Sequence, residues 1–196
     1  MNYLAHAYLS FGHPDILVGN MISDFVKGRK KEDYPDGVRK GIRLHRAIDN
    51  FTDFHAAVAD AKTVFRKDYR LYSGAFVDIV FDHFLAIDPE EFSAGTLKTF
   101  AAKTYAQLEP FVPIFPDPFS RMFPYMESQD WLYNYRFPLG VQHSFGGLVR
   151  RAKYITESET AFRIFERHYD LLRDCYARFF PDLKEFAYLT YLEERP

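Results

Sequence analysis

Two aspartates and a histidine interrupt an apolar stretch of the chain. The segment FVDIVFDHFL, residues 76–85, carries Asp78, Asp82 and His83 among seven bulky apolar residues. An isolated charge is costly to bury, so such side chains persist in apolar surroundings mainly when they are paired or bind a metal ion. Because Asp78 and Asp82 are four residues apart, a helix would place both carboxylates on one face.

The same combination recurs in three other segments. His45 and Asp49 are also four residues apart, within GIRLHRAIDN. His6 interrupts the apolar segment NYLAHAYL, and Asp24 interrupts MISDFV. Helical bundles build metal sites by directing such side chains inward from facing helices. The sequence therefore predicts one metal site assembled from several helices.

The residue types also indicate which metal and which reaction to expect. Mixed His and Asp ligands suit Mn²⁺ or Mg²⁺, with Fe²⁺ and Zn²⁺ as alternatives, and the absence of a cysteine cluster argues against structural zinc. Such an ion polarises a phosphoryl oxygen and lowers the pKa of bound water, while Arg43 or Arg46 could bind the phosphate. The pattern predicts phosphoester hydrolysis.

Each of these residues also has a purely structural explanation. A lone buried histidine such as His6 can be a hydrogen-bonded core residue, and Asp49 can pair with Arg46. Asp24 could cap its own segment, although a carboxylate near a helix C-terminus is unfavourable. The recurrence of the same costly choice in four segments is what favours a shared site.

Composition limits the class of protein. The chain has 196 residues, is 47% hydrophobic and 18% aromatic, and shows no sustained strand-like alternation, which predicts one all-α domain, a helical bundle, over residues 1–196. A net charge of −2 gives no general attraction to nucleic acid. One cysteine, no evident leader and no membrane-spanning apolar run predict a cytoplasmic protein without a membrane partner. The oligomeric state is not predicted.

The spacing of apolar residues and prolines predicts where the helices lie. Expected are short helices over 2–10 and 14–28, a longest helix running from Pro35 through Val58, a central buried helix over 73–88, a helix over 89–111, a proline-rich connector over 112–124, and helices over 128–194 with a break at Pro181.

Residues 27–46 form a strongly basic segment. They include eight Lys or Arg residues against three acidic ones, a local charge of +5 on a chain whose net charge is −2. The segment could bind an anionic partner or could simply be a solvated loop followed by an amphipathic helix. The residues expected to contact such a partner are Lys27, Arg29, Lys30, Lys31, Arg39, Lys40 and Arg43.

Four strings in the first half of the chain resemble the bacterial acyl carrier protein phosphodiesterase family. They are MNYLAHAYLS, GNMISDFVKG, GIRLHRAIDNFTD and DHFL, in this order and at these separations. The resemblance is specific from Met1 to about Leu85 and is carried further by SQDWLYNYR and HYDLLRDCYARFFPDL.

This resemblance implies a metal-dependent hydrolase, typically using Mn²⁺, that removes 4′-phosphopantetheine from holo acyl carrier protein. It also implies an all-α fold distantly related to the HD-type phosphohydrolases. Acyl carrier proteins are small and acidic, so the basic segment would attract the substrate and present it beside His45.

The resemblance also suggests roles for individual residues. The HD signature needs an adjacent His-Asp pair, which this chain lacks; it has His45 with Asp49 and the reversed pair Asp82-His83. By motif position, the residues expected closest to the ion are Asp24, His45 and Asp82. Further ligands or orienting groups are expected to be His6, Asp49 and His83. The residues expected to carry catalysis are Asp24, His45, Arg46 and Asp49.

Two alternative functions remain open at this stage. The first is an HD-like metal phosphohydrolase that acts on a nucleotide or another small phosphoester. The second is a non-enzymatic helical module that binds acidic partners, with its buried acids paired to arginines.

Overall fold

The computed structural model describes residues 1–194, and within that range it contains helices and no strand, so the predicted all-α class is confirmed. The α-helices are α1 (Tyr3–Tyr8), α2 (Pro14–Ile22), α3 (Asp36–Phe54), α4 (Ala56–Tyr69), α5 (Ser73–Ile87), α6 (Thr96–Leu108), α7 (Asp117–Ser128), α8 (Trp131–Asn134), α9 (Pro138–Arg151), α10 (Glu159–Arg167) and α11 (Tyr169–Glu194). Short 3₁₀ segments are η1 (Ser23–Phe25), η2 (Gly28–Asp33), η3 (Arg70–Tyr72) and η4 (Glu109–Ile114).

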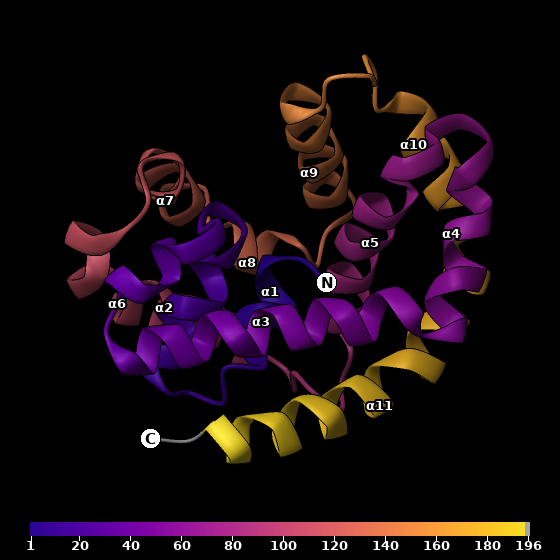
Figure 1. Cartoon of the computed structure of the whole chain (residues 1–196). Coiled ribbons are helices and arrows are strands. Elements are labelled where there is room, and N and C mark those ends of the chain that lie inside the picture. The colour runs from indigo at the N-terminus through magenta and orange to yellow at the C-terminus, as the bar shows by residue number, and fades with distance from the viewer. Residues whose placement is uncertain (195–196) are drawn as a thin grey trace.

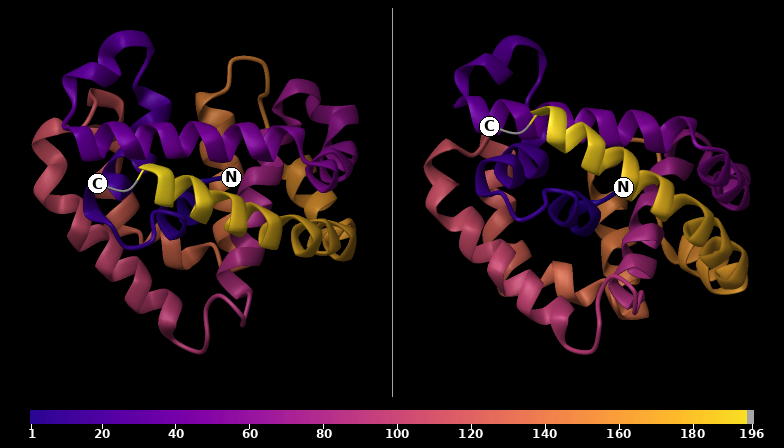
Figure 2. Two further views of the ribbon diagram at one scale, coloured as in Figure 1. Left: turned by 60° about the horizontal axis from the view of Figure 1, so that its bottom comes forward. Right: turned by 90° about the horizontal axis from the view of Figure 1, so that it is seen from below.

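Helix α3 crosses the middle of the molecule, with α11 alongside it (Figure 1). Helices α2 and α1 pack on one part of α3, whereas α4, α5 and α10 lie towards the other end. The segment containing η2 projects from the body in both views of Figure 2. The buried apolar side chains form one core cluster that runs through these helices. Among the described residues, no helix is long and apolar enough to cross a membrane.

Two glycines allow α2 and α3 to touch. A Cβ at Gly19 would lie 2.0 Å from the carbonyl oxygen of Val38, and a Cβ at Gly41 would lie 2.2 Å from that of Ile16. Only glycine fits where two backbones approach this closely. The contact brings the end of α2 against the middle of α3, which is where the candidate site lies.

Three predictions about helix boundaries are wrong. The helix expected to continue through Val58 ends at Phe54, because the backbone becomes extended at His55, whose ring accepts a hydrogen bond from Ala57 N and begins α4. The longest helix is therefore α11, with 26 residues, and not α3, with 19. Pro181 lies inside α11 and does not end it.

The proline-rich connector expected over residues 112–124 is also wrong. Most of it belongs to η4 and to α7, which begins at Asp117. Pro118 lies in the first turn of α7, where a missing N–H costs nothing because that group has no partner within the helix. The helix predicted over 89–111 begins only at Thr96.

Candidate functional site

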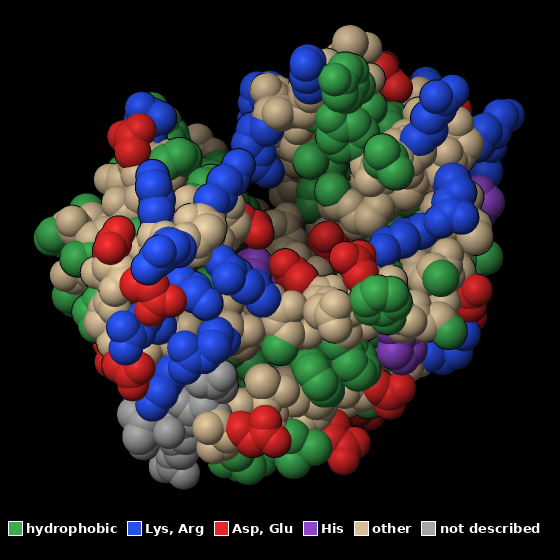
Figure 3. All heavy atoms as spheres, viewed as in Figure 1, with side chains coloured by type: hydrophobic (Ala, Val, Ile, Leu, Met, Phe, Trp, Pro, Cys, Tyr) green, Lys and Arg blue, Asp and Glu red, His purple; other side chains and the backbone are tan. Residues whose placement is uncertain are grey.

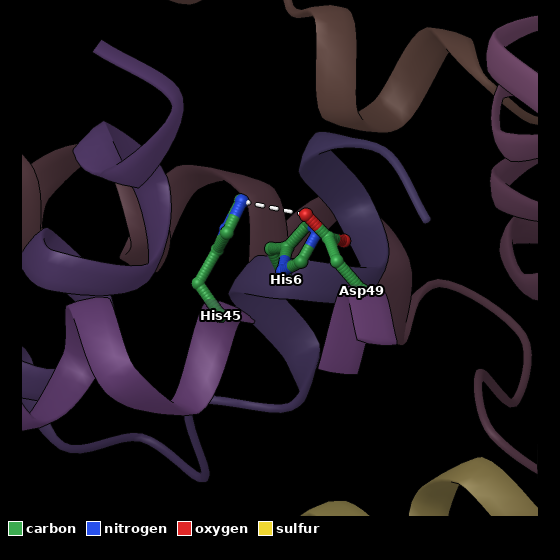
Figure 4. Close-up of side chains that lie close together, drawn as sticks. All are labelled: His6, His45 and Asp49. Atoms are coloured by element: carbon green, nitrogen blue, oxygen red, sulfur yellow. Dashed lines mark ion pairs between the residues drawn. The ribbon is translucent and has the colours of Figure 1, made fainter. Parts of the chain in front are cut away.

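Three side chains from two helices converge beside the α2–α3 contact. His6 from α1 and His45 and Asp49 from α3 each offer a ligand atom, and these atoms all lie within 4.8 Å of one another (Figure 4). Nε2 of His6 lies 3.2 Å from Asp49 Oδ1, and Nε2 of His45 lies 3.0 Å from Asp49 Oδ2. The two imidazole rings are stacked with centroids 3.9 Å apart.

Asn20 at the end of α2 fixes the orientation of both rings. Its side-chain NH₂ donates to the His6 carbonyl oxygen at 2.9 Å and to Ser10 Oγ at 3.1 Å, so its Oδ1 is an acceptor. Nδ1 of His6 lies 2.8 Å from that oxygen, and Nδ1 of His45 lies 2.7 Å from the Asn20 carbonyl oxygen. Since a carbonyl oxygen cannot donate, both Nδ1 atoms carry the proton. In the neutral rings, Nε2 is therefore left with its lone pair.

These lone pairs face carboxylates, which is unfavourable unless a cation lies between them. Nε2 of His45 lies 3.1 Å from Asp24 Oδ1 as well as 3.0 Å from Asp49. Burial alone would lower the pKa of His45, but its hydrogen bonds with Asp24 and Asp49 raise the pKa to about 9, so a proton occupies this position when no other cation does.

The pKa values of His6, Asp49 and Asp24 are shifted by the same contacts. Burial and the adjacent charge of His45 lower the pKa of His6, so the two stacked rings do not both take up a second proton and become positively charged. Burial would raise the pKa of Asp49, but its hydrogen bonds with His45 and His6 hold that pKa well below its usual range. The hydrogen bond from His45 lowers the pKa of Asp24. Both carboxylates are therefore ionised at neutral pH.

The donor set fits a divalent metal ion. Two imidazole nitrogens and a carboxylate are ligands that such ions accept, and each ring has its other nitrogen hydrogen-bonded, as is usual for metal-binding histidines. Asp24 borders the group without belonging to it and is exposed to solvent. His6, His45 and Asp49 thus form a cluster that could hold a divalent metal ion.

Asp82, which the sequence predicted to bind the metal, does not belong to this cluster. Its carboxylate is completely buried and accepts hydrogen bonds from the backbone N–H groups of Asn2, Leu4 and Ala5, at 3.2, 2.7 and 3.2 Å. Burial raises the pKa of Asp82 to about 7, although the α-ammonium group of Met1 and the three donors lower it. Asp82 caps α1 from another helix and thereby positions His6.

His83, the other predicted ligand on α5, also lies outside the cluster and has its own partners. Its Nδ1 donates to the Tyr135 carbonyl oxygen at 2.7 Å, and its Nε2 lies 3.0 Å from the Tyr169 hydroxyl. Asp78, from the same segment, accepts a hydrogen bond of 3.0 Å from the α-ammonium group of Met1. That ammonium group also lies 4.0 Å from Asp49 Oδ1, so it connects Asp78 to the cluster.

The basic residues lie at one side of the cluster. Figure 3 shows Lys and Arg side chains gathered over η2 and the first half of α3, with acidic side chains towards the centre of the same face. Within the basic segment, Arg39 and Lys40 pair with Asp36, and Arg46 donates to the Val26 carbonyl oxygen at 3.0 Å. Exposed members include Lys27, Arg29, Lys30 and Arg43.

Asn20 is the residue that the sequence analysis missed. The available signal was a carboxamide inside the apolar run DILVGNMI, one helical turn before Asp24. Asn20 is completely buried, and a buried amide must satisfy both its donors and its acceptor. Of its two contacts with the histidine rings, however, the one with His45 is made by the Asn20 backbone carbonyl, which any residue type would provide.

Comparison with known proteins identifies the family of this chain. The family model described as acyl carrier protein phosphodiesterase matches residues 1–183. A protein of that name from Yersinia pestis is 32% identical over 188 residues, covering 95% of this chain and 97% of the relative. Proteins of the same name from Photorhabdus laumondii and Klebsiella pneumoniae are 30% and 32% identical over 188 residues, covering 95% of this chain and 95% and 97% of the relatives. No solved structure matches, so the HD-like relationship stays a prediction. The chain belongs to the acyl carrier protein phosphodiesterase family.

Proposed function

We propose that this protein removes 4′-phosphopantetheine from holo acyl carrier protein by metal-dependent hydrolysis of the phosphodiester, leaving the apo carrier protein. Family membership supports the substrate. The observation that carries the proposal of metal dependence is the pair of imidazole Nε2 atoms that face Asp49 with their Nδ1 atoms hydrogen-bonded to Asn20.

The proposed metal ligands are His6, His45 and Asp49, and Mn²⁺ is the proposed ion, with Mg²⁺, Fe²⁺ and Zn²⁺ as alternatives. When bound, a divalent ion supplies Lewis-acid polarisation of the phosphoryl oxygen and a more acidic water molecule. Asp24 is exposed and hydrogen-bonded to His45, so it can accept a proton from that water or hold it in position. Arg46, next to His45 on α3, remains the proposed phosphate-binding residue.

The carrier protein is proposed to dock on the basic segment. Its surplus of positive charge complements an acidic partner and increases the rate of encounter. Reversing Lys30, Lys31 and Arg39 to Glu should raise KM by about tenfold, or about 1.4 kcal/mol of binding free energy, and flatten its salt dependence. The matched control reverses three arginines elsewhere, Arg163, Arg167 and Arg173, for the same change in net charge. Equal effects of the two triple variants would contradict this docking site.

The direct test of function is incubation of the purified protein with holo acyl carrier protein and Mn²⁺. Mass spectrometry of the carrier should show loss of the phosphopantetheine group, and a chelator should prevent that loss. Hydrolysis of nucleotides with an unchanged carrier would instead support a small-molecule phosphohydrolase, and binding without either reaction would support a non-enzymatic module. A cytoplasmic location and the absence of nucleic-acid and membrane partners stay predictions from composition.

A further inference from the structure

A cavity of about 280 Å³ lies between the start of α1, the α7–α8 junction and α9. This volume is close to the lower end of the roughly 300–1,000 Å³ that small-molecule sites occupy. Figure 3 shows the molecule deeply hollowed between the parts that contain α7 and α9, on the face where the acidic side chains gather. None of the residues proposed above to bind the metal ion, to carry catalysis or to dock the carrier protein lines this cavity.

The cavity adjoins the metal cluster through α1. Asn2 and Tyr3 line it, and His6 follows Tyr3 by one turn of the same helix. Burial raises the pKa of Tyr3 to about 12, with the charge of Asp24 acting in the same direction and Arg151 opposing it. The Tyr3 hydroxyl is therefore within electrostatic reach of Asp24, which borders the cluster, and of Arg151 on α9.

Two glycines in α9 leave space where a side chain would fit. Gly146 and Gly147 lie inside the helix and line the cavity. A Cβ at either position would lie 3.7 Å from the flexible guanidinium of Arg150, and a Cβ at Gly146 would also lie 3.9 Å from Ser158 Oγ; both are ordinary contacts. Glycine in a helix interior lowers helix stability, so a pair of glycines with no steric need suggests that the space itself is used.

The cavity wall suits a linear chain that carries amides. Four carboxamide side chains line it, together with aromatic rings that include Trp131. The carboxamides are those of Asn2, Gln129, Asn134 and Gln142. Amide groups of a buried ligand need both donors and acceptors, and its methyl groups need apolar surface. Arg150 and Arg151 add positive charge at the same wall, which suits a phosphate at one end of that chain.

We propose that this cavity binds the pantetheine arm of the substrate, with the phosphodiester at the His6 end and the amide-containing chain running along α9. This inference rests on the proposed function and extends it, because it assigns the part of the substrate that leaves with the phosphate. Pantetheine contains two amides, a hydroxyl group and a pair of methyl groups, which match the mixture of carboxamide and aromatic side chains.

The first test uses Trp131, which is the one tryptophan in the sequence, as a fluorescent reporter. Titration with pantetheine, which lacks both phosphate and carrier protein, should change its emission in a saturable way. Replacement Gln142→Leu should weaken this binding at least fivefold. The control Gln107→Leu, on α6, changes the same residue type outside the cavity and should bind pantetheine like the wild type. No saturable change, or equal weakening by both variants, would overturn the proposal.

The second test fills the cavity with Gly147→Leu, which replaces a helical glycine and should fold at least as well as the wild type, as thermal melting would verify. Its kcat/KM for holo acyl carrier protein should fall about tenfold more than its kcat/KM for bis(4-nitrophenyl) phosphate, which lacks the arm. Equal losses on the two substrates, or no loss, would contradict the assignment. The pantetheine titration needs no turnover, so it decides the cavity's role separately from the wild-type assay that decides the proposed function.

Discussion

Helices α3 and α5 each carry a buried histidine with an aspartate near it, yet they use these residues differently. On α5, Asp82 receives three backbone N–H groups and His83 bonds at both ring nitrogens within the protein. On α3, His45 has one nitrogen bonded to a carbonyl oxygen, while the other faces the carboxylates of Asp24 and Asp49. The α5 groups are satisfied by the fold alone, whereas the α3 groups need a cation.

Solvent exposure follows the same division. Asp82 is completely buried, whereas the side chain of Asp49 is 41% exposed. A ligand can reach the second carboxylate and not the first. Polar residues in an apolar segment therefore do not by themselves indicate a metal or catalytic site. A better indication is a group of acceptor atoms that face one another with no donor between them, as Nε2 of His45 faces the carboxylates of Asp24 and Asp49.

The largest expected effect is on activity, from Asp49→Ala. Loss of a metal ligand removes several kcal/mol of transition-state stabilisation, so kcat/KM for holo acyl carrier protein should fall about 1,000-fold. Thermal melting should change little, because Asp49 is partly exposed. The control is Asp53→Ala, one turn further along α3, where the aspartate pairs with Lys62. A loss of similar size in the control would remove the distinction between the two aspartates.

The next effect is on stability, from Asp82→Ala. Three N–H groups at the start of α1 lose their acceptor, those of Leu4 and Ala5 buried and that of Asn2 partly buried, and each unsatisfied buried donor costs about 1–3 kcal/mol. Urea denaturation should therefore show a loss of at least about 3 kcal/mol in the free energy of unfolding. Asp82→Asn keeps one acceptor oxygen and should recover part of the lost free energy of unfolding. Full stability of Asp82→Ala with loss of metal binding alone would reverse the roles assigned to α3 and α5.

A smaller effect is expected on metal affinity, from Asn20→Ala. His6 loses the acceptor of its Nδ1 proton, so its ring is no longer held with Nε2 towards Asp49. Loss of such an outer hydrogen bond weakens metal binding by about 10–100-fold, measurable by calorimetric titration. Ser10→Ala is the matched control, because Ser10 bonds to Asn20 and not to a histidine ring. Equal losses of metal affinity in the two variants would mean that any disturbance of the hydrogen bonds around Asn20 weakens binding, and not specifically the loss of the contact with the His6 ring.

The smallest effect, counted per pH unit, is a dependence of metal affinity on pH. Without metal, the pKa of His45 is about 9, so at pH 7 the ion must displace a proton. Affinity should rise by up to about tenfold for each unit between pH 6 and 8 and level off near pH 9. Titration in two buffers of different ionisation enthalpy should show release of about one proton. Affinity independent of pH would mean that His45 does not bind the metal.

Part of this arrangement could be predicted from the sequence. The spacing of His45 and Asp49 placed both on one face of a helix, and apolar periodicity identified α5 as a buried helix. The roles of Asp82 and His83 could not be predicted, because their partners are backbone groups and a hydroxyl distant in the chain, including Leu4 N, and such partners leave no residue-type signal. The proline-rich segment was misread because proline at the start of α7 favours a helix.

The central claim is that the cluster on α1 and α3 binds a divalent ion. Metal-stripped protein should be titrated with Mn²⁺, and free Mn²⁺ followed by its electron paramagnetic resonance signal, for the wild type, His45→Ala and Asp53→Ala. The account predicts that the wild type and Asp53→Ala take up the ion alike and that His45→Ala, while still folded, does not. Undiminished uptake by His45→Ala would contradict it.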